Sequence, residues 1–560
     1  MIGGDGEEQP FEGVLVKIAV GQVNPTVGDL SGNRERIARA IAEAGCQGVD
    51  LVVFPELALL GYPPRDLLLQ AGFLDAADRE FSAIVEASSD TAVIIGHVAR
   101  AGTKAGNVAD PSAAAFGGDA LLHNAVFLLA DGAVIGYQSK HRLPSFDVFE
   151  EERYFTPGED MTLLDWRGLR LGLSVCEDFW YENGVLEAQA RAGADLLINV
   201  SASPYFRGKA DIRHRLGRRW AERSGVPFVY ANLVGGQDEL VFDGGSFAVR
   251  PDGQFLLSAP RFAEGLHVFD TAAAPVTPPG EDGLASVRQA LILGIRDYLN
   301  KNGIQGAVIG ISGGVDSAVV AALTCEALGP ERVLGTFFPG PHTAAESEAE
   351  ARQLAEALGI SLIEIPIGRV LATLTEALSP HIPVAGVVAE NLQARIRGVL
   401  WMALTNAMGY VVLACGNKSE IATGYNTLYG DTVGALAPIG DLVKGEVYQL
   451  AHLINGEAPR PIIPEGTLTR PPSAELRPGQ RDDEDLPPYD VLDPLVRALV
   501  EENRLPEELE SLFGQGVVLD VVSRLHRAEH KRKQLPPVIK VSPKAFGMGR
   551  RYPITRRRAG

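Results

Sequence analysis

This sequence has few cysteines, no long apolar run and a negative net charge. The chain has four cysteines and no CxxC pair, which argues against a disulfide framework and predicts a reducing, cytoplasmic location. Its longest apolar runs, such as LVVF at 51–54, are far shorter than the ~18 residues of a membrane helix. The start, MIGGDGEEQPFEG, does not read as a secretory signal. We therefore expect a soluble protein with no membrane partner.

The net charge of −20 opposes general nucleic-acid binding, because phosphate groups would meet an acidic field. Basic residues do gather near the C-terminus, between Lys531 and Arg551 and again in RRR at 556–558. The terminal triplet is typical of a solvated tail. The preceding cluster favours a local site for a polyanionic small molecule.

The length of 560 residues exceeds one ordinary core, so at least two domains are expected. Short β-rich runs alternate with helical patterns between residues 14 and 271, which predicts a layered α/β domain. Periodicity breaks at 272–284, a Pro- and Gly-rich stretch that reads as a linker. A second α/β unit follows at 285–560 and ends in the basic tail, while residues 1–13 are predicted to be a disordered leader.

A glycine-rich string, GISGGVDS at 310–317, is the most informative part of the sequence. It follows a compact apolar run and precedes SAVVAALTCEAL, so it lies at a strand-to-helix turn. Its glycines let backbone N–H groups approach a phosphate, its serines add hydroxyl donors, and the helix start adds positive potential. These features predict a phosphate cradle formed by Gly310, Ile311, Ser312, Gly313, Gly314, Val315, Asp316 and Ser317.

This string lacks the GK[ST] ending of a Walker A loop, so no lysine within it reaches a γ-phosphate. Asp316 instead offers a hard oxygen ligand for Mg²⁺ on a pyrophosphate. The string is similar to the PP-loop of the ATP pyrophosphatase superfamily. That resemblance implies a doubly wound, Rossmann-like parallel sheet and an ATP co-substrate split between its α- and β-phosphates, with adenylation of an acceptor.

Three chemically versatile side chains follow strands of the first half. Glu56 closes LVVFPE, Lys140 follows AVIGYQS and Cys176 follows LRLGLSV. Because the ends of neighbouring strands converge in layered folds, we expect the three to meet at one sheet edge. A thiol needs a base and a nearby positive charge to act as a nucleophile, and Lys140 would also stabilise an oxyanion.

The sequence around these residues resembles the nitrilase (carbon–nitrogen hydrolase) superfamily. The resemblance lies in three motifs, which occur in the family's order: FPELALLGYPPRDLL, KHRLPSFDVFEEERYF and SVCEDFW. The resemblance implies an αββα sandwich in which Glu56 is the base, Lys140 the oxyanion-side ammonium and Cys176 the nucleophile. Further positions follow from it: Glu151 would orient the lysine, and glutamine would contact Phe146, Ser203 and Lys209. Glutamine-dependent members usually carry tyrosine at position 146, so phenylalanine removes a hydroxyl there.

Five later motifs extend the resemblance to nearly the whole chain: ENLQARIRG at 390–398, ACGNKSEIATGYNTLYGD at 414–431, PIGDLVKGEVYQL at 438–450, PPSAELRPGQRDDEDLPPYDVLD at 471–493, and KRKQLPPVIKVSPKAFGMGRRYPI at 531–554. Together with the two catalytic halves, they are similar to the glutamine-dependent NAD⁺ synthetase family. The implied reaction converts deamido-NAD⁺, ATP and glutamine into NAD⁺, AMP, pyrophosphate and glutamate.

That family resemblance also implies site residues in the second half. Lys444 matches a lysine on the ATP phosphates, and Cys415 stands where many relatives have a threonine near ATP. Asp316 and Glu420 match the Mg²⁺ ligands. Deamido-NAD⁺ would contact Asn391, Arg395, Glu420 and Lys531, of which the first two, four residues apart, would share a helix face.

Other functions remain open from the residues alone. The chain could be a PP-loop amidotransferase for another adenylated acceptor, such as xanthylate or a tRNA base, although the acidic charge disfavours the tRNA version. Alternatively, the first half could be a scaffold supporting a synthetase that uses free ammonia. Because nitrilase-like domains commonly pair across a two-fold axis, we also expect a homo-oligomer formed through that half.

Overall fold

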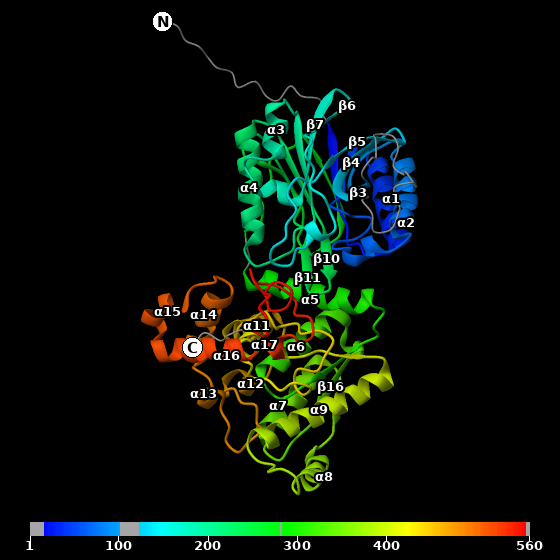
Figure 1. Ribbon diagram of the computed structural model, residues 1–560. Helices are drawn as coiled ribbons and strands as arrows, with labels where there is room; N and C mark the ends of the chain where they lie inside the picture. Colours follow the sequence, from blue (N-terminus) through cyan, green and yellow to red (C-terminus); the bar gives the residue numbers. More distant parts are fainter. Residues whose placement is uncertain (1–15, 101–121, 281–282, 556–560) are drawn as a thin grey trace.

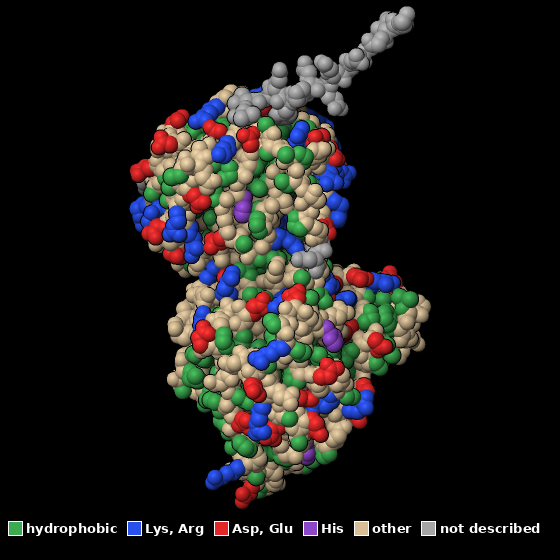
Figure 2. Space-filling model, turned by 180° about the vertical axis from the view of Figure 1, so that it is seen from behind, with side chains coloured by type: hydrophobic (Ala, Val, Ile, Leu, Met, Phe, Trp, Pro, Cys, Tyr) green, Lys and Arg blue, Asp and Glu red, His purple; other side chains and the backbone are tan. Residues whose placement is uncertain are grey.

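The computed structural model describes residues 16–100, 122–280 and 283–555, and the chain forms two lobes (Figure 1). A narrower waist separates them in the view from behind (Figure 2). The leader at 1–13 and the RRR triplet lie outside the described residues, as do residues 281 and 282 of the proposed linker. None of the described helices has the length and apolar character needed to cross a bilayer.

The first lobe has four layers, helix, sheet, sheet and helix, as the nitrilase resemblance implies. Its two sheets have the strand orders β14-β1-β2-β3-β4-β5 and β13-β12-β9-β8-β7-β6. The first contains β1 (Lys17–Gln22), β2 (Leu51–Val53), β3 (Ala92–Arg100), β4 (Leu122–Ala130), β5 (Ala133–Ser139) and β14 (Gly265–Asp270). The second contains β6 (Leu163–Trp166), β7 (Leu169–Val175), β8 (Leu196–Ser201), β9 (Phe228–Asn232), β12 (Phe247–Val249) and β13 (Phe255–Ser258).

Alternation along the strands explains this layering, because successive side chains point to opposite faces of a sheet. In β1, Ile18 and Val20 belong to the cluster between the two sheets, whereas Ala19 faces the outer layer. The outer faces are covered by α1 (Leu30–Cys46) and α2 (Phe73–Ala87) on one side and by α3 (Val185–Arg191) and α4 (Lys209–Ser224) on the other. The layered α/β architecture predicted for this half is therefore confirmed.

The second lobe contains a parallel sheet of order β17-β16-β15-β18. The chain moves outward from β15 to β17 and then returns to pair β18 on the other side of β15. This reversal creates a crevice at the carboxyl ends of β15 and β18, where open α/β sheets bind ligands. The strands are β15 (Ala307–Gly310), β16 (Val333–Phe337), β17 (Ser361–Glu364) and β18 (Val411–Val412).

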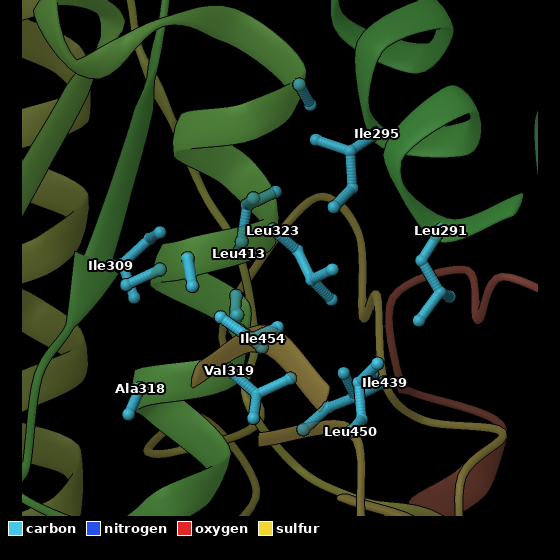
Figure 3. Packing of buried hydrophobic residues seen from close by; sticks show 14 of the residues in the cluster. Leu291, Ile295, Ile309, Ala318, Val319, Leu323, Leu413, Ile439, Leu450 and Ile454 are labelled. Carbon is cyan, nitrogen blue, oxygen red and sulfur yellow. The ribbon is translucent and has the colours of Figure 1, made fainter. Parts of the chain in front are cut away.

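Helices cover both faces of this sheet, so the doubly wound prediction is confirmed. On one face, Ile309 packs with α5 (Leu284–Lys301), α6 (Val315–Leu328) and α11 (Lys444–Glu457) (Figure 3). On the other face, Val308 packs against Trp401 of α9. The other helices are α7 (Ala345–Leu358), α8 (Gly368–Leu378), α9 (Val387–Met408), α10 (Lys418–Thr423), α12 (Glu465–Thr469), α13 (Asp482–Asp485), α14 (Tyr489–Val500), α15 (Pro506–Phe513), α16 (Gln515–Arg527) and α17 (Glu529–Arg532).

Helix α5 joins the two lobes. It packs against the hairpin β10 (Val234–Gln237) and β11 (Leu240–Asp243), and residues of both lobes share one apolar cluster. Asp297 Oδ2 accepts hydrogen bonds from Asn24 Nδ2 and from the Gly236 backbone N–H, both at 2.7 Å. Lys301 Nζ donates to Asn24 Oδ1 at 2.8 Å and to two backbone carbonyls. The lobes are therefore held together by buried contacts.

Replacing Asp297 with alanine is expected to lower the melting temperature. The change leaves the buried Gly236 N–H and the Asn24 amide without their acceptor, a loss of ~1–3 kcal/mol of unfolding free energy. The matched control is Asp520→Ala, which removes only an exposed i,i+4 pair with Arg524 and costs a few tenths of a kcal/mol. Equal changes in the melting temperatures of the two variants, measured by scanning calorimetry, would contradict a stabilising role for the Asp297 hydrogen bonds.

Candidate active sites

The first site centres on a buried ammonium between two carboxylates. Lys140 Nζ, fully buried, lies 2.7 Å from Glu56 Oε1 and 2.7 Å from Glu151 Oε1. Burial alone would lower the pKa of Lys140, but Glu151 and Glu56 together raise it well above its usual value. Burial also raises the pKa of Glu151, and Lys140 opposes that shift. Lys140 therefore remains a positive charge.

Cys176 lies beside this group at the end of β7. It starts a short 3₁₀ turn, Cys176–Trp180, and has a φ of 41°, a left-handed conformation that is strained for a side chain of this kind. Burial raises the pKa of its thiol well above the usual value, the negative charge of Glu56 adds to the rise, and Lys140 opposes it. The thiol is therefore protonated near neutral pH and needs a base.

Glu56, Lys140 and Cys176 do lie in one region, but the expectation that they meet at one sheet edge is wrong. Glu56 follows β2 and Lys140 follows β5, which belong to the first sheet, whereas Cys176 follows β7 of the second. The site is thus formed between two sheets packed face to face. Gly96 of β3 leaves room for the backbone of Glu56, because a Cβ there would lie 2.5 Å from the Cα of Glu56.

Sequence reasoning missed two further side chains of this site. Asn124 Nδ2 donates to Glu56 Oε1 at 2.7 Å, and Tyr62 Oη donates to Glu151 Oε1 at 2.7 Å. The Ala202 backbone N–H also donates to Glu56 Oε2 at 2.7 Å. Tyr62 stands in the GYPP stretch of the first motif, which was an available signal, whereas Asn124 is the second residue of the run HNAVFLLA, outside the motifs.

The residues expected to contact glutamine differ in their exposure to solvent. Ser203 is buried, and its backbone N–H donates to Asn232 Oδ1 at 2.9 Å. Lys209, at the start of α4, is 9% exposed and donates to the Pro204 carbonyl at 2.9 Å. Burial and the nearby Arg213 lower the pKa of Lys209 to about 7. Phe146 is 55% exposed and packs edge-on against Phe149.

The second site is a cavity of 310 Å³ at the carboxyl ends of β15 and β18. All eight residues of the predicted phosphate loop, 310–317, line it, as do Cys415, Glu420 and Lys444. Gly313 has a φ of 81°, and a Cβ there would lie 2.7 Å from the Ser347 carbonyl oxygen. Ser312 Oγ accepts from the Gly314 N–H at 3.2 Å. The loop therefore has the close backbone approach that a phosphate cradle requires.

Lys444 lies between the two predicted metal ligands. Its ammonium forms a short ion pair with Asp316 and is 3.5 Å from Glu420 Oε1. Asn417 Nδ2 donates to Asp316 Oδ1 at 2.9 Å, and Asn417 and Glu420 cap each other at the start of α10. Burial, and next Asp316, raise the pKa of Glu420 to about 8, and Lys444 opposes the rise. This arrangement concentrates charge next to the phosphate loop.

Asp316 and Glu420 supply the oxygen donors that Mg²⁺ prefers. In the described ranges, no group of three or more His, Cys, Asp or Glu side chains is placed to hold a metal ion by itself. Two carboxylates beside a phosphate cradle nevertheless fit Mg²⁺, which usually binds one or two carboxylates together with substrate phosphates.

Of the residues expected to contact a dinucleotide, Glu420 lines the cavity, whereas Asn391, Arg395 and Lys531 lie behind its wall. Thr427 Oγ1 donates to Asn391 Oδ1 at 2.7 Å, and Arg395 Nε donates to the Leu428 carbonyl at 3.2 Å. Both residues are on α9 and face the same segment, as their spacing predicts. Lys531 Nζ donates to the Gly424 and Asn426 carbonyls at 2.7 and 2.5 Å. All three therefore hold the 424–428 loop.

Residues 459–489 are rich in proline and acidic residues, a composition typical of a surface loop, but they contain α12 and α13 and form part of the cavity wall. Arg470 Nη1 donates to Ser347 Oγ at 2.7 Å, and its other terminal nitrogen donates to the Gly313 carbonyl at 3.3 Å. Asp482 also lines the cavity, and Tyr489 Oη donates to its Oδ2 at 3.0 Å. Because this segment is rich in proline and acidic residues, its sequence did not predict that Arg470 and Asp482 contribute to the cavity.

Cys415 lines the cavity with its sulfur 3.7 Å from the Leu413 carbonyl oxygen. Burial raises the pKa of this thiol well above its usual value, and the charges of Asp316 and Glu420 add to the rise. A neutral thiol is a weaker hydrogen-bond donor than a hydroxyl. Cys415 is therefore suited to pack against a nucleotide rather than to donate to it.

Comparison with known proteins gives matches along nearly the whole chain. The family model described as carbon-nitrogen hydrolase matches residues 17–277, and the one described as NAD synthase matches residues 287–535. A glutamine-dependent NAD(+) synthetase from Synechocystis sp. is 41% identical over 96% of this chain and 98% of its own. One from Thermotoga maritima is 38% identical over 97% and 99%. The structure of the Acinetobacter baumannii enzyme in complex with ADP is 33% identical, with a TM-score of 0.76 over 96% and 98%.

Proposed function

The chain belongs to the family of glutamine-dependent NAD⁺ synthetases, and from this premise we propose how its residues divide the reaction. The protein is an ATP-consuming carbon–nitrogen ligase that amidates deamido-NAD⁺ with ammonia from glutamine. The observation that best supports this proposal is that one chain contains both a buried Glu–Lys–Cys group and a cavity lined by a phosphate loop. We assign the glutaminase domain to 14–271, the linker to 272–284 and the synthetase domain to 285–560.

In the glutaminase half, Glu56 takes the proton of Cys176 as the sulfur attacks the side-chain amide of glutamine. The raised pKa of the thiol makes this base necessary. Lys140, fixed by Glu56 and Glu151, stabilises the negative oxygen of the tetrahedral intermediate. Glu56 then protonates the leaving nitrogen, which departs as ammonia, and a water activated by Glu56 hydrolyses the thioester to glutamate.

In the synthetase half, the phosphate loop and Lys444 bind ATP, and the carboxylate of deamido-NAD⁺ attacks its α-phosphorus. Lys444 neutralises charge as pyrophosphate leaves. Ammonia then attacks the adenylated carboxyl group and displaces AMP. We propose Asp316 and Glu420 as ligands of Mg²⁺, which would offset the charge of the phosphates. We also propose that Asn391, Arg395 and Lys531 act on the dinucleotide through the 424–428 loop that they hold.

The testing experiment supplies purified protein with Mg-ATP, deamido-NAD⁺ and either glutamine or ammonium. NAD⁺ and AMP are expected with both nitrogen sources, and glutamate only with glutamine. If no NAD⁺ forms with ammonium although ATP binds, the assigned acceptor is wrong. If ammonium works and glutamine does not, the first lobe is a scaffold. The comparisons do not favour xanthylate or a tRNA base as acceptor. The homo-oligomer, the absence of a nucleic-acid partner and the cytoplasmic location stay predictions.

Glutamine binding is expected to weaken as pH rises above about 7. We propose that Lys209 pairs with the carboxylate of glutamine, and burial and Arg213 lower the pKa of this lysine to about 7. It carries its positive charge below that pH and loses it above, so kcat/KM for glutamine should fall on the alkaline side. Glutamate release measured from about pH 6 to about pH 8.5 checks this. Lys209→Arg, which stays charged, should remove the dependence in that window; an unchanged profile would contradict the assignment.

A further inference from the structure

A second cavity, of 370 Å³, lies between the lobes. Its walls come from both halves of the chain. The first lobe contributes Phe146, Phe149 and Lys209, and the second contributes Glu501, Asn503 and Lys544. A space of this size admits a free amino acid.

The cavity has more basic than acidic side chains on its wall, and two of the basic ones have no acidic partner in the part of the chain that the structure describes. Lys540 faces Asp147 at 3.3 Å, and Glu501 accepts from Lys418 Nζ at 2.5 Å, so both acids already have basic partners. Lys209 and Lys544 have, among the described residues, no carboxylate at ion-pair distance. The acceptor of Lys209 is the Pro204 carbonyl, and that of Lys544 is Asn503 Oδ1 at 3.2 Å. The cavity therefore presents two ammonium groups that are not paired with a carboxylate of the described ranges.

Aromatic side chains connect the same cavity to the catalytic group. Lys209 and Phe149 both belong to the cavity wall. The aromatic wall continues from Phe149 to Tyr62, with ring centroids 6.5 Å apart, and Tyr62 donates to Glu151. A molecule held by the two lysines therefore lies against the aromatic side chains that lead to the catalytic group.

We propose that Lys544 of the synthetase lobe binds the α-carboxylate of glutamine together with Lys209, so that both lobes build the donor site. The proposal rests on the glutaminase function above and adds a specificity residue from the other half of the chain. Two ammonium groups favour an amide donor that carries a carboxylate over one that does not. A charge-assisted hydrogen bond of this kind corresponds to about tenfold in affinity.

The test uses the full-length Cys176→Ala protein, which binds glutamine without turnover, in calorimetric titrations. Adding Lys544→Met is expected to raise the Kd for glutamine about tenfold, and Lys544→Arg to restore most of the affinity. Lys533→Met, which changes an exposed lysine of the same lobe, should leave the Kd unchanged. The second probe is 4-aminobutanamide, which is glutamine without its α-carboxylate. Its Kd should not respond to Lys544→Met.

Three results would overturn the proposal. One is an unchanged Kd for glutamine in the Lys544→Met protein. Another is an equal weakening of both probes, which would mean a general structural effect. The third is an unchanged glutamine affinity with a lower ratio of NAD⁺ to glutamate in the Lys544→Met enzyme that retains Cys176, which would mean that the cavity conducts ammonia. NAD⁺ formation from ammonium tests the synthetase function separately.

Discussion

Replacing Cys176 with alanine should abolish the use of glutamine while synthesis from ammonium continues. The sulfur is the only atom proposed to form a bond with the donor, so its removal should lower glutamate release by a factor of at least ~10³. Ammonium bypasses this step, because it reaches the adenylated acceptor without hydrolysis of an amide. NAD⁺ and glutamate formed with each nitrogen source are the quantities to measure.

A matched control is Cys46→Ala, because Cys46 is an exposed cysteine of the same lobe. It should retain both activities. Loss of the ammonium reaction in the Cys176→Ala protein would show that the two sites cannot work separately. Full glutamine use in that protein would eliminate Cys176 as the nucleophile.

Replacing Asp316 with alanine should remove NAD⁺ synthesis with either nitrogen source. The change deletes a proposed Mg²⁺ ligand and also the short ion pair with Lys444 and the hydrogen bond from Asn417. The phosphate-binding group would lose both its charge balance and its geometry. We expect a loss of at least ~10²–10³ in the rate of pyrophosphate release.

Glutamate release in the Asp316→Ala protein serves as a check that the chain is folded, since this reaction belongs to the other lobe. Glu326→Gln is the companion variant, because Glu326 lies on the same helix but pairs with Arg288 at the surface. It should keep both activities. Normal pyrophosphate release from the Asp316→Ala protein would refute the role given to this carboxylate.

The first half shows what local patterns can and cannot predict. Strand runs bounded by turn residues predicted the strands, because alternation of side chains is a local property. The meeting of Glu56, Lys140 and Cys176 came from motif resemblance. Strand ends alone gave the wrong geometry, since nothing local reveals that β7 belongs to a different sheet from β2 and β5.

The second half adds a different lesson. The phosphate loop was predictable because its glycines, serines and flanking strand and helix are contiguous in sequence. Arg470 and Asp482 were not, because they reach the cavity from a segment whose composition is typical of a loop. The proposed role of Lys544 is even harder to predict from the sequence. Its relation to Lys209 depends on how two separately predicted units pack, which no single segment encodes.

The shared apolar cluster at α5 bears on how this chain can be divided. Tyr205, Val234 and Val241 of the first lobe are buried in the same cluster as Leu291 and Ile295 of α5. Cutting the chain before residue 284 would expose this surface to water on both fragments, and fragments with such patches tend to aggregate. Either half produced alone would need polar replacements on that face, so exchanging one ammonia source for another requires a redesigned junction as well as a new catalytic unit.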